Sequence, residues 1–229
     1  MSKRMFDIVV AAIGLIVLSP IFVVVAILIR LDSRGSIFFR QERVGKGLRP
    51  FSIYKFRTMR MDADRHGGQI TVGEDPRITR VGRVLRKAKL DELPQLINVL
   101  KGEMSFVGPR PEVPRYVEMF RNDYEQILAI RPGITDLASL RYRNESTLLG
   151  QSSDPEHEYI THVLPDKLKL SHEYLQKSSL LFDLTLIFKT LLNLLPYGGN
   201  APGTHHSSTE VTECTRPQRN HLYDNGQQN

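Results

Sequence analysis

The sequence of 229 residues predicts an α+β fold that is mostly helical, with a small β-hairpin and an N-terminal membrane helix. Three observations lead to this expectation. An uncharged, mostly aliphatic run fills residues 8–29, two short β-prone segments follow at 36–40 and 51–56, and later segments repeat apolar residues at helical spacing. A chain of this length builds one sizeable core but hardly two full domains. We therefore expect one main domain attached to a membrane segment.

The apolar run is long enough to enter a membrane. As a continuous helix its 22 residues extend for roughly 33 Å, which is enough to cross a hydrocarbon core. The run exceeds the apolar part of a secretory signal peptide, and Arg30 follows it in place of a small-residue cleavage site. The sequence therefore favours a retained anchor.

Ser19-Pro20 stands in the middle of this run and predicts a break. Proline removes a backbone donor and disfavours α geometry at the residue before it. The alternative is an ordinary spanning helix with a proline kink, which membranes tolerate. The positive residues on both sides of the run favour the break, because they place both of its ends in the cytoplasm. We expect a re-entrant helix that turns at Ser19-Pro20, and the flanking residues are Lys3, Arg4, Arg30, Arg34, Arg40 and Arg43.

The charge of the chain indicates an anionic partner. The net charge is +6, which suits nucleic acid, an anionic membrane surface or a phosphorylated substrate. The chain lacks the interleaved aromatic and basic residues of a nucleic-acid surface, so no nucleic acid is expected. The only cysteine, Cys214, excludes a disulfide framework and a cysteine-based metal site, as expected for a reducing compartment.

The segments after the anchor predict a hairpin, a loop and a basic helix. Residues 36–40 and 51–56 flank a Gly45-Lys46-Gly47 turn region, and residues 61–76 are polar and contain glycine. A helix expected over 78–89 follows directly on Arg77, which begins a series of arginines repeated every three residues. In an isolated soluble helix such a stripe is a solvated face. Here it leads into a pair of carboxylates, and its members are Arg77, Arg80, Arg83 and Arg86.

Asp91 and Glu92 are the most informative residues of the chain. They precede a helix predicted by the spacing of Leu93, Leu96, Ile97 and Leu100, with Pro94 in its first turn. Adjacent carboxylates at a non-helical helix start can converge on one hard cation such as Mg²⁺. The competing interpretation is a helix cap, because acidic residues also suit a helix N-terminus.

Two rigid basic turns follow, and then further helices. Arg110 lies between Pro109 and Pro111, so its guanidinium is presented with little entropy to lose and suits an anion. Arg131 begins a second such turn. Helices are expected over 112–130, 166–176 and 180–195, the last with an apolar face wide enough for a core or for the bilayer interface. The composition divides the chain into a membrane helix (1–34), a main domain (35–197) and a disordered tail (198–229).

Several short motifs occur along the chain and are specific in combination. They are Ser19-Pro20, Tyr54-Lys55-Phe56-Arg57-Thr58-Met59, Leu90-Asp91-Glu92-Leu93-Pro94-Gln95-Leu96, Val99-Leu100-Lys101-Gly102-Glu103-Met104-Ser105, Val107-Gly108-Pro109-Arg110-Pro111 and Arg131-Pro132-Gly133-Ile134-Thr135. With these motifs in this order, the chain strongly resembles the bacterial sugar transferase family, the small monotopic phosphoglycosyl transferases. The resemblance runs from about residue 3 to residue 195.

The resemblance implies a reaction. Such enzymes move a sugar 1-phosphate from a UDP-sugar to polyprenyl (undecaprenyl) phosphate and release UMP, as the first membrane step of exopolysaccharide, capsule, O-antigen or glycoprotein glycan synthesis. By this likeness Asp91 is the nucleophile, which forms a covalent phosphosugar intermediate in a ping-pong reaction. Glu92 is its partner in acid-base or metal-positioning work, and Mg²⁺ is the cofactor that both carboxylates would bind. The phosphate-binding residues are expected to be Lys55, Arg57, Arg86, Arg110 and Arg131.

The resemblance also implies a location at the bacterial inner membrane, with residues 35–197 as the catalytic domain on the cytoplasmic face and inner-membrane lipid around the anchor. One departure stands out: many relatives have glycine after Gly-Ile-Thr, where this chain has Asp136. That change bears on which sugar or nucleotide the loop recognises, and not on the reaction. The sequence leaves open which sugar and which polymer are involved and whether the chain acts as a homodimer. A basic membrane adaptor and a glycosyltransferase that releases UDP are the alternative functions.

Overall fold

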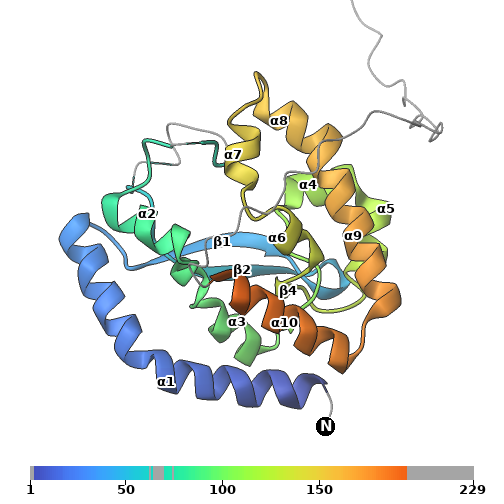
Figure 1. Cartoon of the computed structure of the whole chain (residues 1–229), viewed down its shortest axis with the longest axis horizontal. Helices are drawn as coiled ribbons and strands as arrows, with labels where there is room; N and C mark the ends of the chain where they lie inside the picture. The colour runs from blue at the N-terminus through green and yellow to red at the C-terminus, as the bar shows by residue number, and fades with distance from the viewer. Residues whose placement is uncertain (1–2, 62, 64–69, 74, 195–229) are drawn as a thin grey trace, which may run out of the picture. The chain divides into compact units, whose positions relative to one another are not determined.

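The N-terminal helix α1 (Lys3–Asp32) is one continuous, bent helix in the computed structural model, which describes residues 3–61, 63, 70–73 and 75–194 (Figure 1). Proline at position 20 cannot donate to the carbonyl of Ile16, four residues earlier. The Ser19 hydroxyl donates to that carbonyl at 2.7 Å instead, so the freed acceptor has a partner. The expected break is therefore a bend within a continuous helix, and the re-entrant path stays a prediction.

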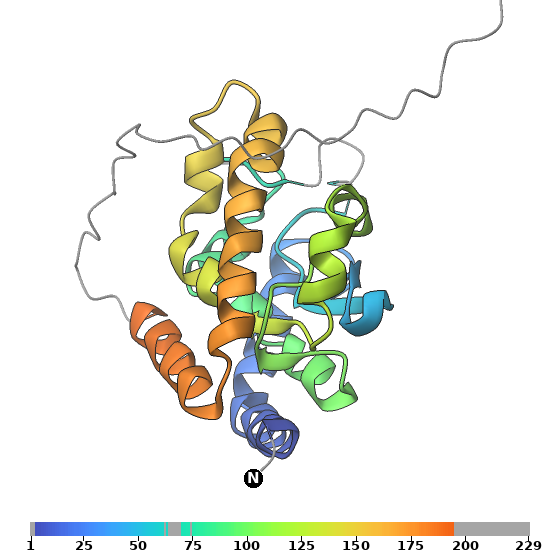
Figure 2. The same cartoon turned by 90° about the vertical axis from the view of Figure 1, so that its right-hand side faces the viewer.

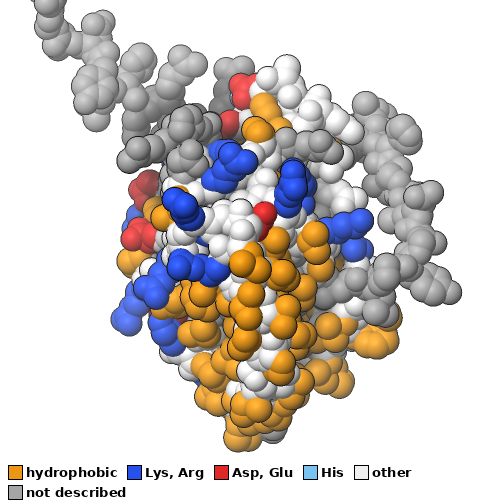
Figure 3. Space-filling model, turned by 90° about the vertical axis from the view of Figure 1, so that its left-hand side faces the viewer, with side chains coloured by type: hydrophobic (Ala, Val, Ile, Leu, Met, Phe, Trp, Pro, Cys, Tyr) orange, Lys and Arg blue, Asp and Glu red, His pale blue; other side chains and the backbone are white. Residues whose placement is uncertain are grey.

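α1 lies along the domain and leaves most of its apolar surface outside. Its first half packs Ala11 against Leu96 and Val99, and its second half packs Val25 and Ile29 in a second cluster. Only 11% of its most apolar stretch is buried, far less than a core helix would bury. Figure 3 shows a continuous hydrophobic surface at this end of the molecule, with Lys and Arg side chains above it. Most apolar side chains of α1 therefore lie on its outer face, away from the core.

The expected hairpin is confirmed. β1 (Phe38–Val44) pairs antiparallel with β2 (Pro50–Phe56), and the short helix η1 (Lys46–Leu48) makes the turn. A second pair, which the sequence did not predict, joins β3 (Ser105–Val107) to β4 (Gly133–Thr135) in parallel. Each of these strands has three residues, too few for an alternating pattern to be recognised.

Helices form the rest of the described chain. Those expected over 78–89, 166–176 and 180–195 are present as α2, α9 and α10, whereas the segment 112–130 forms two helices, α4 and α5. Phe120 separates α4 from α5, because its backbone (φ −122°, ψ 40°) is not helical. The elements are α2 (Arg80–Lys87), η3 (Leu90–Glu92), α3 (Gln95–Lys101), α4 (Pro114–Met119), α5 (Arg121–Ile127), α6 (Leu137–Arg141), α7 (Glu145–Leu149), α8 (Pro155–Glu158), η4 (Tyr159–Val163), α9 (Leu164–Lys177) and α10 (Leu180–Leu194).

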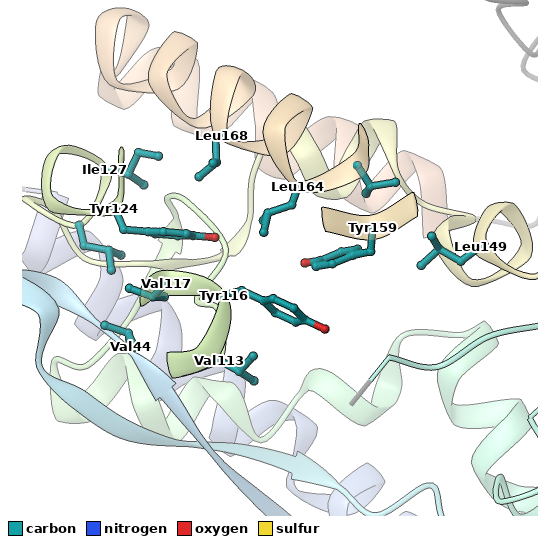
Figure 4. Close-up of a cluster of buried hydrophobic side chains, with 12 residues drawn as sticks. Val44, Val113, Tyr116, Val117, Tyr124, Ile127, Leu149, Tyr159, Leu164 and Leu168 are labelled. Atoms are coloured by element: carbon teal, nitrogen blue, oxygen red, sulfur yellow. The ribbon is translucent and has the colours of Figure 1, made fainter. Parts of the chain in front are cut away.

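The largest buried cluster lies between β1, the helices α4 and α5, and α9 (Figure 4). Tyr116 and Tyr159 pack with their ring centroids 5.1 Å apart, while Ile127 and Leu164 are almost fully buried. Complete burial of one such aliphatic side chain contributes roughly 1.5–3 kcal/mol. This core includes Val113 and Val117, which follow the turn around Arg110 in the chain.

α10 lies near α1 at one end of the unit, as Figures 1 and 2 both show. Lys3 at the start of α1 donates to the carbonyl of Val107 at 2.8 Å and to Tyr174 at 3.0 Å, and it pairs with Asp183 on α10. Leu181 and Phe188 of α10 are 78% and 61% exposed. The two helices therefore present their apolar faces at the same end of the molecule. The tail expected over 198–229 lies outside the described residues.

Candidate active site

Asp91 and Glu92 lie in a separate 3-10 turn, η3, between α2 and α3. Lys89 starts this turn in the left-handed region (φ 56°), which is uncommon and costly for a residue with a side chain. The N-cap of α3 is Pro94, and no side chain caps that helix. Neither carboxylate side chain therefore caps α3.

Glu92 is held between two cations from different parts of the fold. Lys55, near the end of β2, donates to Glu92 Oε1 at 2.8 Å, and Arg110 pairs with the same oxygen and donates to Oε2 at 3.4 Å. Burial alone would raise the pKa of Glu92, but the charges of Arg110 and Lys55 outweigh burial and hold that pKa well below its usual range. Glu92 is therefore the ionised centre that positions Lys55 and Arg110.

Asp91 has the opposite environment. Its side chain is buried, and Oδ1 has no hydrogen-bond partner within the described part of the chain. Burial raises the pKa of Asp91, and the neighbouring charge of Glu92 raises it further, against the attraction of Lys55 and Arg86. An unpartnered carboxylate oxygen in such a position is costly unless a ligand or an ion uses it. The two adjacent carboxylates thus differ: both oxygens of Glu92 have cationic partners, whereas Asp91 has an oxygen without a hydrogen-bond partner.

Arg86 reaches this region from α2. Its Nε donates to the hydroxyl of Thr58 at 2.9 Å and its Nη1 to that of Thr71 at 3.3 Å, while Asp91 is the charge that attracts it most strongly. Close packing places α2 here, because a Cβ on Gly82 would come within 2.1 Å of the Thr58 carbonyl oxygen. Thr58 was not predicted as a functional residue, although it belongs to the motif that contains Lys55. Its role could not be recognised before Arg86 was placed beside it.

Arg110 is held by its backbone as well as by Glu92. Its amide donates to Asp136 Oδ2 at 3.1 Å, and Asp136 Oδ1 accepts from the Ser139 amide at 2.6 Å, which caps α6. The turn that carries Arg110 is also tightly packed, since a Cβ on Gly133 would lie 2.1 Å from the Gly108 nitrogen. Asp136 therefore supports the arginine of the site.

Two predicted phosphate-binding residues lie apart from this cluster. Arg57 donates to the carbonyl oxygens of Ser33 and Arg34 at 2.7 and 2.8 Å, just after α1 ends. Arg131 donates to the carbonyl of Gly102 at 2.8 Å. The structure thus brings together five of the seven predicted catalytic and phosphate-binding residues, and gives these two arginines backbone partners elsewhere. The five are Lys55, Arg86, Asp91, Glu92 and Arg110.

The donor set fits a metal that binds few protein ligands. Within the described residues, no group of three His, Cys, Asp or Glu side chains could hold a metal ion. Mg²⁺ commonly keeps several waters and binds one or two carboxylates together with substrate phosphates. The open oxygen of Asp91 suits that mode, whereas both oxygens of Glu92 already have cationic partners.

Comparison with known proteins gives a family match that includes every residue the structure describes. The model of the bacterial sugar transferase family matches residues 1–196. The chain is 39% identical over 198 residues to the UDP-N-acetylgalactosamine-undecaprenyl-phosphate N-acetylgalactosaminephosphotransferase of Aeromonas hydrophila, which covers 84% of this chain but 43% of that protein.

Two further relatives are closer to this chain in length. A putative undecaprenyl-phosphate N-acetylgalactosaminyl 1-phosphate transferase of Bacillus subtilis is 50% identical over 121 residues, which cover 53% of this chain and 68% of that protein. The exopolysaccharide production protein ExoY of Sinorhizobium fredii is 39% identical over 205 residues, which cover 83% of this chain and 84% of that protein.

Proposed function

The chain belongs to the bacterial sugar transferase family and is a phosphoglycosyl transferase, and we propose that it transfers a sugar 1-phosphate from a UDP-sugar to undecaprenyl phosphate and releases UMP. One observation supports this assignment above the others. Asp91 presents a buried, unpartnered carboxylate oxygen beside the cations that Glu92 organises. Such a site suits a nucleophile that must approach a negatively charged diphosphate.

In the first half-reaction, the Asp91 carboxylate attacks the β-phosphorus of the donor. A bond forms between the carboxylate oxygen and that phosphorus, the bond from the phosphorus to the bridging oxygen breaks, and UMP leaves with the bridging oxygen. Arg110 and Arg86 would neutralise the phosphate oxygens as charge moves toward UMP. Glu92 keeps Lys55 and Arg110 in place, so its contribution is to preorganise the cations.

In the second half-reaction, a phosphate oxygen of undecaprenyl phosphate attacks the same phosphorus. The bond to Asp91 breaks, the carboxylate is regenerated, and the product is a polyprenyl diphosphate sugar. The two half-reactions share one site, so a single set of cations serves both phosphates.

Mg²⁺ is the proposed cofactor. One Asp91 carboxylate oxygen would hold the ion while the other attacks phosphorus, and Glu92 would bind the ion only by releasing one of its present partners. When bound, the ion supplies positive charge to the phosphoryl oxygens.

Membrane association follows from the family and from the exposed apolar faces of α1 and α10. We propose that the catalytic domain faces the cytoplasm, because positive residues at both ends of the apolar run favour that side. A bent α1 that enters and leaves one leaflet is consistent with this arrangement.

Product analysis tests the proposal. The purified full chain, with Mg²⁺, undecaprenyl phosphate and a panel of UDP-sugars, should release UMP with at least one donor. With donor alone, labelled at the β-phosphate, the protein should acquire the label at Asp91. Asp91→Asn should lose both signals, and Glu118→Gln, at a carboxylate on α4 that is 70% exposed, should keep both. UDP release would contradict phosphosugar transfer, and a label on another residue would contradict the assignment of Asp91.

A further inference from the structure

An apolar groove lies between the second half of α1 and α2. Its volume is about 410 Å³, within the range of small-ligand sites, and its lining exposes no polar surface. One wall comes from α1, the other from α2, and Leu90 also lines the groove. The lining residues are Pro20, Ile21, Val24, Val25, Leu28, Val81, Val84, Leu85 and Leu90.

The groove is continuous with the segment that carries the nucleophile. Leu90, which lines it, is the first residue of the η3 turn, and Asp91 is the next residue of the same turn. Leu85 of the opposite wall directly precedes Arg86, which reaches toward the Asp91 region. The groove therefore borders the two segments that carry Asp91 and Arg86.

Cationic side chains border the apolar wall of α2. Arg80 and Lys87 lie four residues before and three residues after the exposed Val84, so they are its neighbours on the helix surface. Within the described part of the chain, no ion pair joins Arg80, Arg83 or Lys87 to an acidic side chain. Figure 3 shows Lys and Arg side chains above the hydrophobic surface on this side of the molecule. An anionic group attached to an apolar chain would meet both kinds of surface here.

We propose that this groove binds the first isoprene units of the polyprenyl phosphate acceptor and directs its phosphate toward Asp91. This inference rests on the proposed function, and it adds the site at which the lipid part of the acceptor binds. A purely apolar lining discriminates against the donor, whose sugar and nucleotide would lose hydrogen bonds with water there. It suits a hydrocarbon, and the adjacent cations suit a phosphate.

A neighbouring pair of valines on α1 offers a matched test. Val24 lines the groove and is 55% exposed, while Val23 does not line it and is 60% exposed. Val24→Phe should fill part of the groove and raise the KM for undecaprenyl phosphate about tenfold or more, a penalty typical of a mismatched apolar pocket. Val23→Phe should leave that KM unchanged. UMP release in a single turnover with donor alone should be the same in both variants.

An unchanged acceptor KM in Val24→Phe, with donor-only UMP release intact, would overturn the proposal. If Val24→Phe also lost donor-only release, Val84→Phe on the α2 wall would replace it, with the same expected and contradicting results. If the unmodified chain released no UMP from donor alone, the proposed function would fail first, and direct labelling of the groove would still test the acceptor site.

Direct labelling uses an undecaprenyl phosphate analogue with a diazirine in its first isoprene units, added to the full chain in detergent micelles. Photolysis should place adducts on residues 20–28 or 81–90, and unlabelled undecaprenyl phosphate should compete for them. Excess phosphatidylglycerol should not. Adducts confined to other segments, or complete competition by phosphatidylglycerol, would show that the groove holds another hydrocarbon or none.

Discussion

Isosteric neutralisation of the two adjacent carboxylates should lower stability only at Glu92, while both changes remove activity. Asp91→Asn replaces a buried carboxylate whose oxygen lacks a partner. Glu92→Gln removes the anion shared by Lys55 and Arg110. The first substitution relieves an unfavourable charge and the second creates two uncompensated ones.

The pH linkage gives the sign of each effect. The folded-state pKa of Asp91 is raised, by burial first and by Glu92 second, so ionisation of Asp91 above an unfolded pKa of about 3.9 destabilises the fold. That cost persists at neutral pH, and Asp91→Asn removes it. The folded-state pKa of Glu92 is lowered, so its contribution is present above an unfolded pKa of about 4.3 and is lost as the pH falls through the folded value.

The size of the Glu92 effect follows from burial. Removing one partner of a buried ion pair costs roughly 3–5 kcal/mol. The Glu92 side chain is 13% exposed, but Lys55 and Arg110 are 21% and 34% exposed, so water screens part of the loss. We expect about 2–4 kcal/mol, which lowers the thermal midpoint of a domain of this size by roughly 4–16 °C.

Thermal unfolding at pH 7, followed by circular dichroism in one detergent, measures both effects. Asp91→Asn should unfold at the same or a higher temperature than the unmodified chain, and Glu92→Gln at a clearly lower one. Glu118→Gln, at a side chain that is 70% exposed, is the control and should shift the midpoint very little. Equal shifts of the same sign for Asp91→Asn and Glu92→Gln would refute the distinct roles assigned to them.

Three further predictions concern pH, topology and the support of Arg110. Because the pKa of Asp91 is raised, kcat/KM should fall on the acidic side at a pH above the ordinary aspartate pKa of about 3.9, and this fall should move to lower pH as the Mg²⁺ concentration increases. A fall whose pH does not depend on Mg²⁺ would show that the metal does not bind Asp91. Replacing Ser19 and Pro20 by Ala and Leu restores helix propensity worth roughly 3 kcal/mol, so a cysteine at position 2 should react with an external reagent in that variant but not in the parent; external labelling of the parent would exclude re-entry. Asp136→Ala should lower kcat at least tenfold with a smaller loss in Asp136→Asn, which keeps an acceptor for the Arg110 amide; equal activities would deny Asp136 this role.

The sequence predicted the elements that form between residues close together in the chain. The hairpin and α2 followed from β-prone runs and helical spacing, and the carboxylate pair followed from its motif. The parallel pair β3–β4 did not, because its strands are short and join segments about 28 residues apart. The partners of Arg57 and Arg131 were also not predictable, since a basic residue in a motif gives no direction for its side chain. Both bind backbone carbonyls instead of lying beside Asp91.

The bend of α1 connects the membrane segment to the chemistry. Before Pro20, α1 packs Ala11 against α3 residues, and after Pro20 it packs Val25 and Ile29 in the cluster that includes Leu90. α3 and the η3 turn follow one another along the chain, so the two halves of α1 contact both parts of the segment that carries Asp91. A straight helix could not keep both contacts with the same residues, because the bend is what directs its second half along α2 (Figure 1). The bend therefore lets both halves of α1 support the segment that carries Asp91.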